Sequence, residues 1–397
     1  MTRLAHTLGL TEFQTDIVAN VREFVNKEII PAAQELERTD TYPQEIVDRM
    51  RDMGLFGLMI PEEYGGLGES LLTYALCVEE LARGWMSISG VINTHFIVAY
   101  MLRQHGTPEQ KERLLPRMAI GEVRGAFSMS EPELGSDVAA IRTRAKKNDD
   151  DTYTIDGQKM WLTNGGSSTL VAVLVRTDEG AEKPHRNLTT FLIEKPAGFG
   201  EVAPGLVIPG KIDKLGYKGI DTTELIFDGY VASADDILGG TPGRGFFQMM
   251  DGVEVGRVNV SARACGVGQR AFELAVRYAQ QRKTFGKPIA EHQAIAFQLA
   301  EMATKVESAH LMMVNAARLK DSGERNDVAA GMAKYLASEL CAEVTQQSFR
   351  IHGGYGYSKE YEIERLMRDA PFLLIGEGTS EIQKQIISKR LLEEYRI

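Results

Sequence analysis

Cysteine is scarce in this 397-residue chain, and its histidines have no spacing typical of a metal site. The three cysteines, Cys77, Cys265 and Cys341, are odd in number and far apart, each inside a helical pattern. This arrangement predicts buried free thiols in a reducing compartment rather than disulfides. None of the seven histidines falls into an H-x-x-x-H pattern or joins a cysteine at metal-ligand spacing, so we expect no metal site.

Long apolar runs are also missing. The longest, residues 170–175, has the length of a strand and falls far short of the ~18 residues that a membrane span needs. Residues 1–7 lack the apolar core of a signal peptide, and acidic residues follow soon after. A net charge of −10 disfavours binding to a phosphate backbone. We therefore expect a cytoplasmic protein that binds neither membrane nor nucleic acid.

The spacing of apolar residues changes twice along the chain. Residues 11–118 have helical spacing and begin with a capping box of Thr11 and Gln14. After residue 245 helical spacing returns, with long helices over 290–320 and 327–350 that we expect to lie antiparallel in a bundle. Between the helical regions, short β-rich segments predict a small antiparallel sheet with turns at 156–157 and 164–166; they lie at 153–155, 170–176, 190–194 and 223–228.

One carboxylate stands in a distinctive loop near the C-terminus. Glu377 lies between Gly376 and Gly378, and glycines on both sides allow a backbone to approach a ligand closely. Ser380 and Gln383 have the spacing of a capping box, which places Glu377 in the loop just before a helix. Two interpretations are open from this segment alone: a catalytic base beside a ligand, or an ordinary glutamate in a surface loop.

Hydroxyl groups and one of the two tryptophans gather between the first helical region and the strands. Residues 125–137 form a predicted loop whose N–H groups, Ser130 and Ser136 suit an anionic or heteroaromatic ligand. The alternative is an ordinary polar crossover. Trp161 stands beside Thr163 and a turn, where it either packs in the core or faces a planar cofactor.

Three cations mark the end of the helix that follows residue 245. Arg282, Lys283 and Lys287 either stabilise a helix C-terminus with Gly286 as its stop, or form a diphosphate clamp. In the second case Arg282 supplies a fork of donors. No G-x-G-x-x-G follows a predicted strand, so we do not expect a Rossmann dinucleotide site.

Five motifs together, in their order along the chain, resemble those of the acyl-CoA dehydrogenase family. They are Ser-Glu-Pro-Glu-Leu-Gly-Ser-Asp at 130–137, Gly-Gln-Lys-Met-Trp-Leu-Thr-Asn-Gly-Gly at 157–166, Arg-Lys-Thr-Phe-Gly-Lys at 282–287, His-Gly-Gly-Tyr-Gly at 352–356 and Glu-Gly-Thr-Ser at 377–380. The resemblance covers the whole chain and implies an α+β multi-domain fold. Its parts are an N-terminal α-helical domain over 1–120, a middle antiparallel β domain over 121–238 and a C-terminal four-helix bundle over 239–397. It also implies an FAD-dependent homotetramer, built as a dimer of dimers.

The same resemblance implies two groups of FAD contacts. Around the isoalloxazine ring and the base it places Phe127, Met129, Ser130, Ser136, Trp161, Thr163, Thr379 and Glu381. The adenosine diphosphate half, partly on a neighbouring subunit, is expected to meet Arg282, Thr284, Gln293, Gly353 and Gly354. Arg350 replaces a glutamine common in the family, and we carry it over as a contact to a phosphate.

The reaction implied is α,β-desaturation of an acyl-CoA thioester. Glu377 is expected to take the pro-R α-proton while the β-hydrogen leaves as hydride to flavin N5. Substrate contacts carried over from the family are Ser136, Glu254, Arg257 and Gly378. Some branches place the base directly before the arginine, but Gly256 stands there, which leaves Glu377 alone. Glu254, three residues before Arg257, is expected to form a helical ion pair or to touch substrate rather than to act as the base.

Straight-chain members often have tyrosine where this chain has Gly376, which predicts room for a branched, cyclic or otherwise wide acyl group. Electrons are expected to pass to an electron-transfer flavoprotein. One alternative is an acyl-CoA oxidase that returns electrons to oxygen, which the chain length disfavours. Another is a noncatalytic flavin-fold binding protein, such as the DNA-associated branch, which Glu377 and the acidic balance disfavour. Acyl chain length and pathway do not follow from the sequence.

Overall fold

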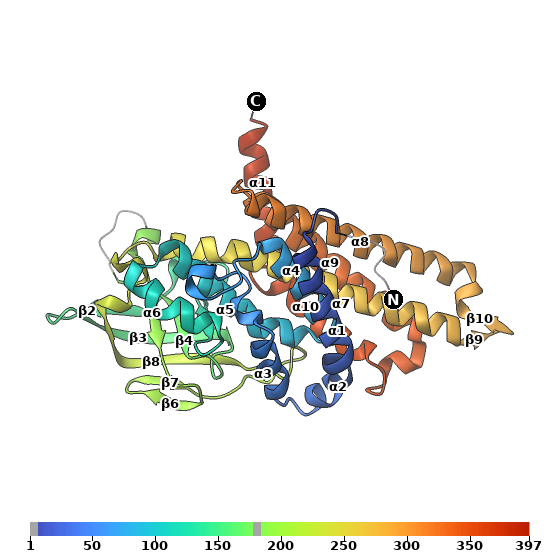
Figure 1. Ribbon diagram of the computed structural model, residues 1–397, viewed down its shortest axis with the longest axis horizontal. Coiled ribbons are helices and arrows are strands. Elements are labelled where there is room, and N and C mark those ends of the chain that lie inside the picture. Colours follow the sequence, from blue (N-terminus) through green and yellow to red (C-terminus); the bar gives the residue numbers. More distant parts are fainter. Residues whose placement is uncertain (1–6, 178–183, 397) are drawn as a thin grey trace.

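The computed structural model of the chain describes residues 7–177 and 184–396 (Figure 1). A sheet lies at one end of the long axis and long helices extend to the other, with the first helices between them (Figure 1). This order matches the predicted α+β arrangement of helical, strand-rich and helical segments. Residues 1–6, which hold most of the segment considered for a signal peptide, lie outside the described residues.

Six α-helices and a short π-helical turn make up the described N-terminal part. The capping box that begins the first helix is confirmed, because the Gln14 N–H donates to Thr11 Oγ1 at 3.1 Å and the Thr11 N–H donates to the Gln14 side chain. The helices α4 and α5 are buried along nearly their whole length, so polar groups on them are screened from water. The elements are α1 (Glu12–Phe24), the π-helical turn (Val25–Ile29), α2 (Ile30–Arg38), α3 (Gln44–Asp52), α4 (Leu71–Gly84), α5 (Met86–His105) and α6 (Pro108–Ala119).

Within the described residues, eight strands form one sheet in the order β1-β4-β2-β3-β8-β7-β6, with β5 paired to β4. Most neighbours are antiparallel, as predicted, but β1 and β2 both run parallel to β4. The strands are β1 (Gly125–Ser128), β2 (Arg144–Lys147), β3 (Thr152–Thr163), β4 (Leu170–Arg176), β5 (Leu188–Glu194), β6 (Gly200–Ala203), β7 (Leu206–Ile208) and β8 (Thr222–Ser233).

Two local predictions in the strand-rich region are wrong. The predicted loop at 125–137 begins as a strand, because the backbone of residues 125–128 pairs with the fully buried β4. The predicted turn at 156–157 is a bulge inside β3, where the ladder with β8 shifts register. Gly157 has φ +140°, and a Cβ there would lie 2.7 Å from Thr143 Cα, so the position requires glycine for a bulge rather than for a turn.

The predicted long helices of the C-terminal region are confirmed, and α7 contacts α8, α9 and α10. However, α7 ends at Gln281 rather than at Gly286, because Arg282 already has an extended backbone. Gly286 lies instead in the turn of a small hairpin. The elements are α7 (Gly245–Gln281), β9 (Lys283–Thr284), β10 (Lys287–Pro288), α8 (Gln293–Asp321), α9 (Asp327–His352), α10 (Ile363–Ile375) and α11 (Ser380–Glu394).

The start of α11 differs from the predicted capping box. Thr379, not Ser380, is the N-cap, and its Oγ1 accepts a hydrogen bond from the Ile382 N–H at 3.3 Å. The Ser380 hydroxyl donates to Glu339 at 2.7 Å, because it has turned toward α9. Gln383 donates to the carbonyls of residues 377 and 378 at 3.2 and 3.1 Å. Gln383, predicted as the second residue of the capping box, therefore holds the loop that carries Glu377.

Cys77, Cys265 and Cys341 are buried, as predicted. Among the residues that the structure describes, no helix is long and apolar enough to cross a membrane. In those same ranges, 7–177 and 184–396, no three His, Cys, Asp or Glu side chains are grouped so that they could hold a metal ion.

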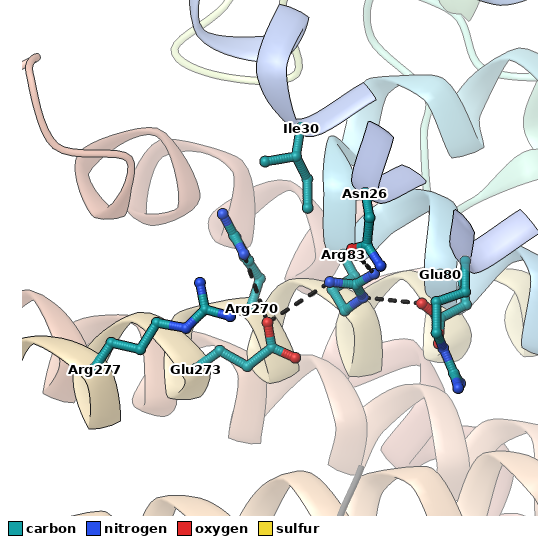
Figure 2. A pocket seen from close by; sticks show the side chains of 8 residues that line it. Asn26, Ile30, Glu80, Arg83, Arg270, Glu273 and Arg277 are labelled. Atoms are coloured by element: carbon teal, nitrogen blue, oxygen red, sulfur yellow. Dashed lines mark hydrogen bonds and ion pairs between the residues drawn. The ribbon is translucent and has the colours of Figure 1, made fainter. Parts of the chain in front are cut away.

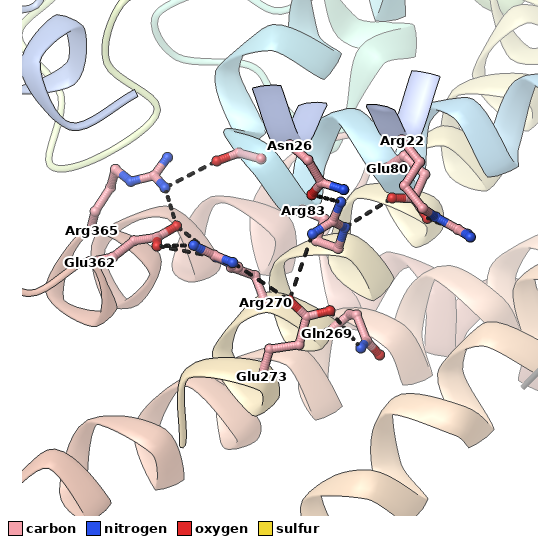
Figure 3. A network of polar contacts seen from close by, with 10 residues as sticks. Arg22, Asn26, Glu80, Arg83, Gln269, Arg270, Glu273, Glu362 and Arg365 are labelled. Carbon is pink, nitrogen blue, oxygen red and sulfur yellow. Dashed lines mark hydrogen bonds and ion pairs between the residues drawn. The ribbon is translucent and has the colours of Figure 1, made fainter. Parts of the chain in front are cut away.

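A buried ion network joins α4, α7 and the start of α10 (Figure 3). Arg270 on α7 lies 3.6 Å from Glu273 and 2.6 Å from Glu362. Arg83 on α4 lies 2.9 Å from Glu80 and 3.7 Å from Glu273. Side chains of this network line a cleft of about 280 Å³ (Figure 2). Since loss of one partner would leave a buried charge unpaired, the network fixes α7 against the N-terminal helices.

Candidate active site

Glu377 lies in the tight turn between α10 and α11. Its φ is +54° and that of Gly378 is +88°, so two successive residues have left-handed backbone. Such strain, of the order of 1–3 kcal/mol for a residue with a side chain, persists where surrounding contacts hold the backbone. Lys334 Nζ supplies such contacts by donating to the carbonyls of Gly378 at 2.7 Å and Leu374 at 3.3 Å, in addition to the bonds from Gln383.

The Glu377 carboxyl is enclosed between α5 and α7. Asn93 on α5 donates from Nδ2 to Glu377 Oε1 at 3.4 Å. On α7, a Cβ added to Gly256 would lie 2.8 Å from Glu377 Oε2 and 3.0 Å from Ile97. Position 256, where some family branches are expected to carry the base, thus faces the Glu377 carboxyl directly. In this chain Gly256 has only a hydrogen atom there.

Three cations act on this carboxyl. Desolvation raises the pKa of Glu377, while the hydrogen bond from Asn93 and the charges of Arg263, Arg257 and Lys334 partly offset the rise. Desolvation also lowers the pKa of Lys334 to about 8, against the opposing effect of Glu377. A carboxylate whose pKa is raised is a stronger base than an exposed one.

Arg257 and Glu254 both lie on α7 but do not form the predicted ion pair with one another. Glu254 Oε2 instead lies 2.9 Å from Nζ of Lys320 on α8. Arg257 is buried, and its Nε makes no hydrogen bond to any described residue. Lys320 is thus the ion-pair partner of Glu254, while Glu254 and Glu377 both act on Arg257 through their charges.

The residues expected around the isoalloxazine ring come together on β1, β3 and the segment after β1. Phe127 and Met129 are half-buried, and the Met160 N–H donates to Ser130 O at 2.9 Å, which holds that segment against β3. Trp161 is 58% exposed with φ +65°, so the alternative of core packing is wrong for this side chain. Thr163 is half-buried, and Ser136 is exposed beyond the end of β1.

The residues expected around the adenosine diphosphate half gather at the far end of the bundle. Exposed Arg282 lies over the ring of Tyr355 at 5.8 Å, close to the hairpin that contains Thr284. Gln293 is the first residue of α8, and Gly353 and Gly354 end α9 with no atom near a built Cβ. Arg350 is also exposed, on the last turn of α9.

Figure 1 places β9 and β10 at the opposite end of the molecule from β3. Thr379 and Glu381 lie at the start of α11.

Sequence reasoning missed the groups that surround Glu377, namely Asn93, Lys334, Gln383 and Arg263. Each is a polar residue inside a helix rich in apolar residues, and this was the signal available. A polar residue in such a helix is buried only where the fold supplies a partner, so the sequence does not reveal which ones converge.

Comparisons with known proteins agree with this arrangement. Sequence models of acyl-CoA dehydrogenases match three parts of the chain: the N-terminal domain over residues 11–122, the middle domain over 126–230 and the C-terminal domain over 243–392. The chain belongs to the acyl-CoA dehydrogenase family. This acyl-CoA dehydrogenase is therefore an oxidoreductase.

Individual relatives span nearly the full chain. An acyl-CoA dehydrogenase of Bacillus subtilis is 38% identical over 97% of this chain and 99% of its own length. A (2S)-methylsuccinyl-CoA dehydrogenase of Cereibacter sphaeroides is 38% identical over 97% of this chain and 70% of its own. The butyryl-CoA dehydrogenase structure from Megasphaera elsdenii has a TM-score of 0.92 at 36% identity and covers 98% and 100% of the two chains.

FAD is the cofactor of this family, and a glutaryl-CoA dehydrogenase from Mycobacterium smegmatis, with 26% identity and a TM-score of 0.88 over 97% and 95% of the two chains, was solved with FADH2. The side chains of this dehydrogenase fit such a group. The exposed Trp161 ring suits a planar heterocycle, and the buried Ser128 hydroxyl on β1 has no partner among the described residues. The exposed Arg282 and the N-terminus of α8 suit a diphosphate.

Proposed function

We propose that this acyl-CoA dehydrogenase desaturates an acyl-CoA thioester between its α and β carbons, with Glu377 as the base. The observation that carries this proposal is the Glu377 carboxyl, enclosed between α5 and α7 with a raised pKa and a strained, firmly held backbone. FAD, when bound, accepts the β-hydrogen with its electron pair.

The chain has to make a weakly acidic C–H bond yield its proton to a carboxylate. Glu377 takes the α-proton on its carboxyl, and Asn93 orients that group from α5. The backbone N–H of Glu377 is proposed to donate to the thioester carbonyl and to stabilise the charge that develops there. A single donor of this type typically contributes roughly 10²–10³ in rate. The left-handed φ of Glu377, held by Lys334 and Gln383, fixes where this N–H points.

The two sets of FAD contacts are proposed to belong to different subunits. Strand β3, which carries Trp161, and strand β9, which directly follows Arg282, lie at opposite ends of the molecule (Figure 1). A single FAD bound at Trp161 would therefore take its diphosphate contacts from a second copy, in keeping with the homotetramer expected from the sequence. Arg350 is proposed to meet a phosphate, and Arg350→Gln should weaken FAD retention in the purified protein. Unchanged FAD retention would show that Arg350 lies at a solvated helix end and does not contact FAD.

Electron-transfer flavoprotein is the proposed electron acceptor. The competing oxidase function predicts a different fate for the electrons after reduction. Admission of air to the reduced protein should restore the flavin band slowly and give little peroxide if the enzyme is a dehydrogenase. Rapid recovery with stoichiometric peroxide would favour the oxidase.

The deciding experiment is an anaerobic visible spectrum of the purified flavoprotein, titrated with straight, branched, cyclic and aromatic acyl-CoAs. Bleaching of the flavin band by one subset is the expected result and would define the substrate class. A bound flavin that no thioester bleaches would overturn the proposed desaturation and favour the noncatalytic alternative.

A further inference from the structure

Arg263 is the most unusual charged group in the interior of this protein. Its side chain is fully buried, and none of its three guanidinium nitrogens makes a hydrogen bond to a described residue. Buried arginines are normally paired, because a desolvated charge without a partner is costly. Arg270, another buried arginine of α7, differs, because it is bonded to Glu362.

Two aromatic rings lie on one side of the Arg263 guanidinium. The group lies 4.6 Å from the centroid of the Tyr217 ring and 5.1 Å from that of Phe372. Aromatic rings interact with the faces of a guanidinium, whereas its N–H donors lie in the plane. Desolvation raises the pKa of Tyr217 and the charge of Arg263 opposes that rise, but the two groups lack the geometry of a hydrogen bond.

Arg263 lies in the same compartment as Glu377. Positions 256, 259 and 263 fall on one stripe of α7, and the two ends of the stripe are about 10 Å apart along the axis. Helical side chains lean toward the N-terminus, so Arg263 extends back toward Gly256 and the base. Across from it, a Cβ on Gly90 of α5 would lie 1.9 Å from the Tyr217 hydroxyl, one turn before Asn93.

Phe372 closes the side of this compartment that Gly376 was expected to leave open. A Cβ on Gly376 would lie 2.8 Å from Phe372 Cζ. The ring therefore occupies the space where a side chain at residue 376 would begin, and it stacks on Tyr217 with centroids 4.6 Å apart. The expected room for a wide acyl group is thus replaced by a rigid aromatic wall against Arg263.

Three cations act on Glu377, and two of them have further carboxylates beside them. Glu254 and Asp327 also act on Arg257, and Glu339 and Glu381 also act on Lys334, whereas Arg263 acts on Glu377. Asp369, another buried carboxyl, accepts from the Tyr217 N–H at 2.7 Å, and the charges that lower its pKa are those of Arg365 and Arg368. An anion of the substrate would give Arg263 a carboxylate of its own.

We propose, on the basis of the function proposed above, that Arg263 binds a carboxylate at the far end of the acyl chain. The substrates are then CoA monothioesters of short dicarboxylic acids, of roughly four to six carbons given the spacing along α7. A planar fork of buried donors matches a carboxylate in two parallel hydrogen bonds, and a hydrocarbon chain would leave all of these donors unpaired.

The test compares charged and uncharged thioesters of equal length on the wild-type flavoprotein. Succinyl-, glutaryl- and adipyl-CoA are each paired with their terminal carboxamides and with the unbranched acyl-CoA. The readout is the second-order rate constant of anaerobic flavin bleaching. At least one diacid thioester should exceed its carboxamide about 100-fold, a typical effect of a buried charged contact. Equal or faster bleaching by the neutral partners would overturn the proposal and leave the desaturation intact, whereas no bleaching by any thioester would refute the desaturation itself.

Variants assign the effect to Arg263. Arg263→Gln should lose about 100-fold on the diacid thioester and less than tenfold on the neutral ones, and Arg263→Lys should retain part of the preference. The exposed Arg277→Gln on the same helix is the matched control and should change neither rate. An equal loss on both classes would show that Arg263 serves only as a counter-ion of Glu377. If Arg263→Gln fails to retain FAD, the wild-type comparison still decides the proposal.

Discussion

Gly256 on α7 faces the carboxyl of Glu377 so closely that a methyl group at residue 256 would lie 2.8 Å from Oε2. Carbon and oxygen atoms that are not bonded need more room than this, so the carboxyl would have to move. Gly256 therefore belongs to the geometry of the proposed base even though it carries no functional group.

Gly256→Ala is expected to displace the base without harming the fold. Alanine in the interior of a helix stabilises the folded protein by about 0.5–1 kcal/mol relative to glycine. This gain offsets part of the destabilisation caused by the local clash. A displacement near 1 Å at the reacting atoms can lower the rate about 10²-fold. Stopped-flow bleaching with the best acyl-CoA measures this loss, and thermal unfolding measures the fold. A full rate in this variant would show that the carboxyl is not held against α7. Gly331→Ala is the control, because its Cβ would lie 3.5 Å from its nearest neighbour.

Glu377→Gln should retain FAD and lose the bleaching reaction by about 10²–10⁴-fold, as expected for loss of a general base. The amide keeps the size of the side chain and its contact with Asn93. Glu254→Gln is the comparison, because Glu254 pairs with Lys320 at the surface of α8 and should leave most of the rate. Full activity of Glu377→Gln would reject the assignment of the base.

Asn93→Ala should move the pH dependence of bleaching. The base must be ionised, and the hydrogen bond from Asn93 lowers the pKa of Glu377 against the rise caused by desolvation. Without that bond the pKa rises further, so the increase in rate should occur at higher pH than in the wild type. The rate at a pH well above the transition should change less. An unmoved transition would indicate that another group titrates.

Glu362→Gln should destabilise the folded protein at neutral pH by about 3–5 kcal/mol, because Arg270 and Arg365 would lose a buried partner. Desolvation raises the pKa of Glu362, but the charges and hydrogen bonds of Arg365 and Arg270 outweigh it and hold the pKa below its ordinary value. The stability that this carboxylate contributes is therefore present above the ordinary glutamate pKa.

That contribution is lost as the pH falls through the lowered pKa of the folded state. Urea unfolding at a series of pH values should show the wild type approaching the Glu362→Gln variant in acid. The exposed neighbour Glu360→Gln should change the free energy of unfolding by no more than about 0.5 kcal/mol at any pH. A constant difference between Glu362→Gln and wild type would contradict the linkage.

The sequence by itself determined the order of helices and strands, the start of α1 at Thr11, the burial of the cysteines and the family. These features depend on residues close in the chain or on motifs read along it, because caps, turns and apolar periods are local. Prediction from the local sequence failed where two neighbouring residues could each cap the same helix. Thr379 and Ser380 are both good caps, and only the contact of Ser380 with Glu339 decided between them.

The tertiary structure alone decided which polar side chains meet around Glu377. Asn93 and Glu377 are 284 residues apart, and Lys334 reaches the loop from a different helix. The same is true of Arg263, whose lack of a hydrogen-bond partner among the described residues becomes visible only when Tyr217 and Phe372 are seen to lie against its guanidinium. Burial of a polar group is a property of the assembled core, because its cost depends on partners brought together from distant segments.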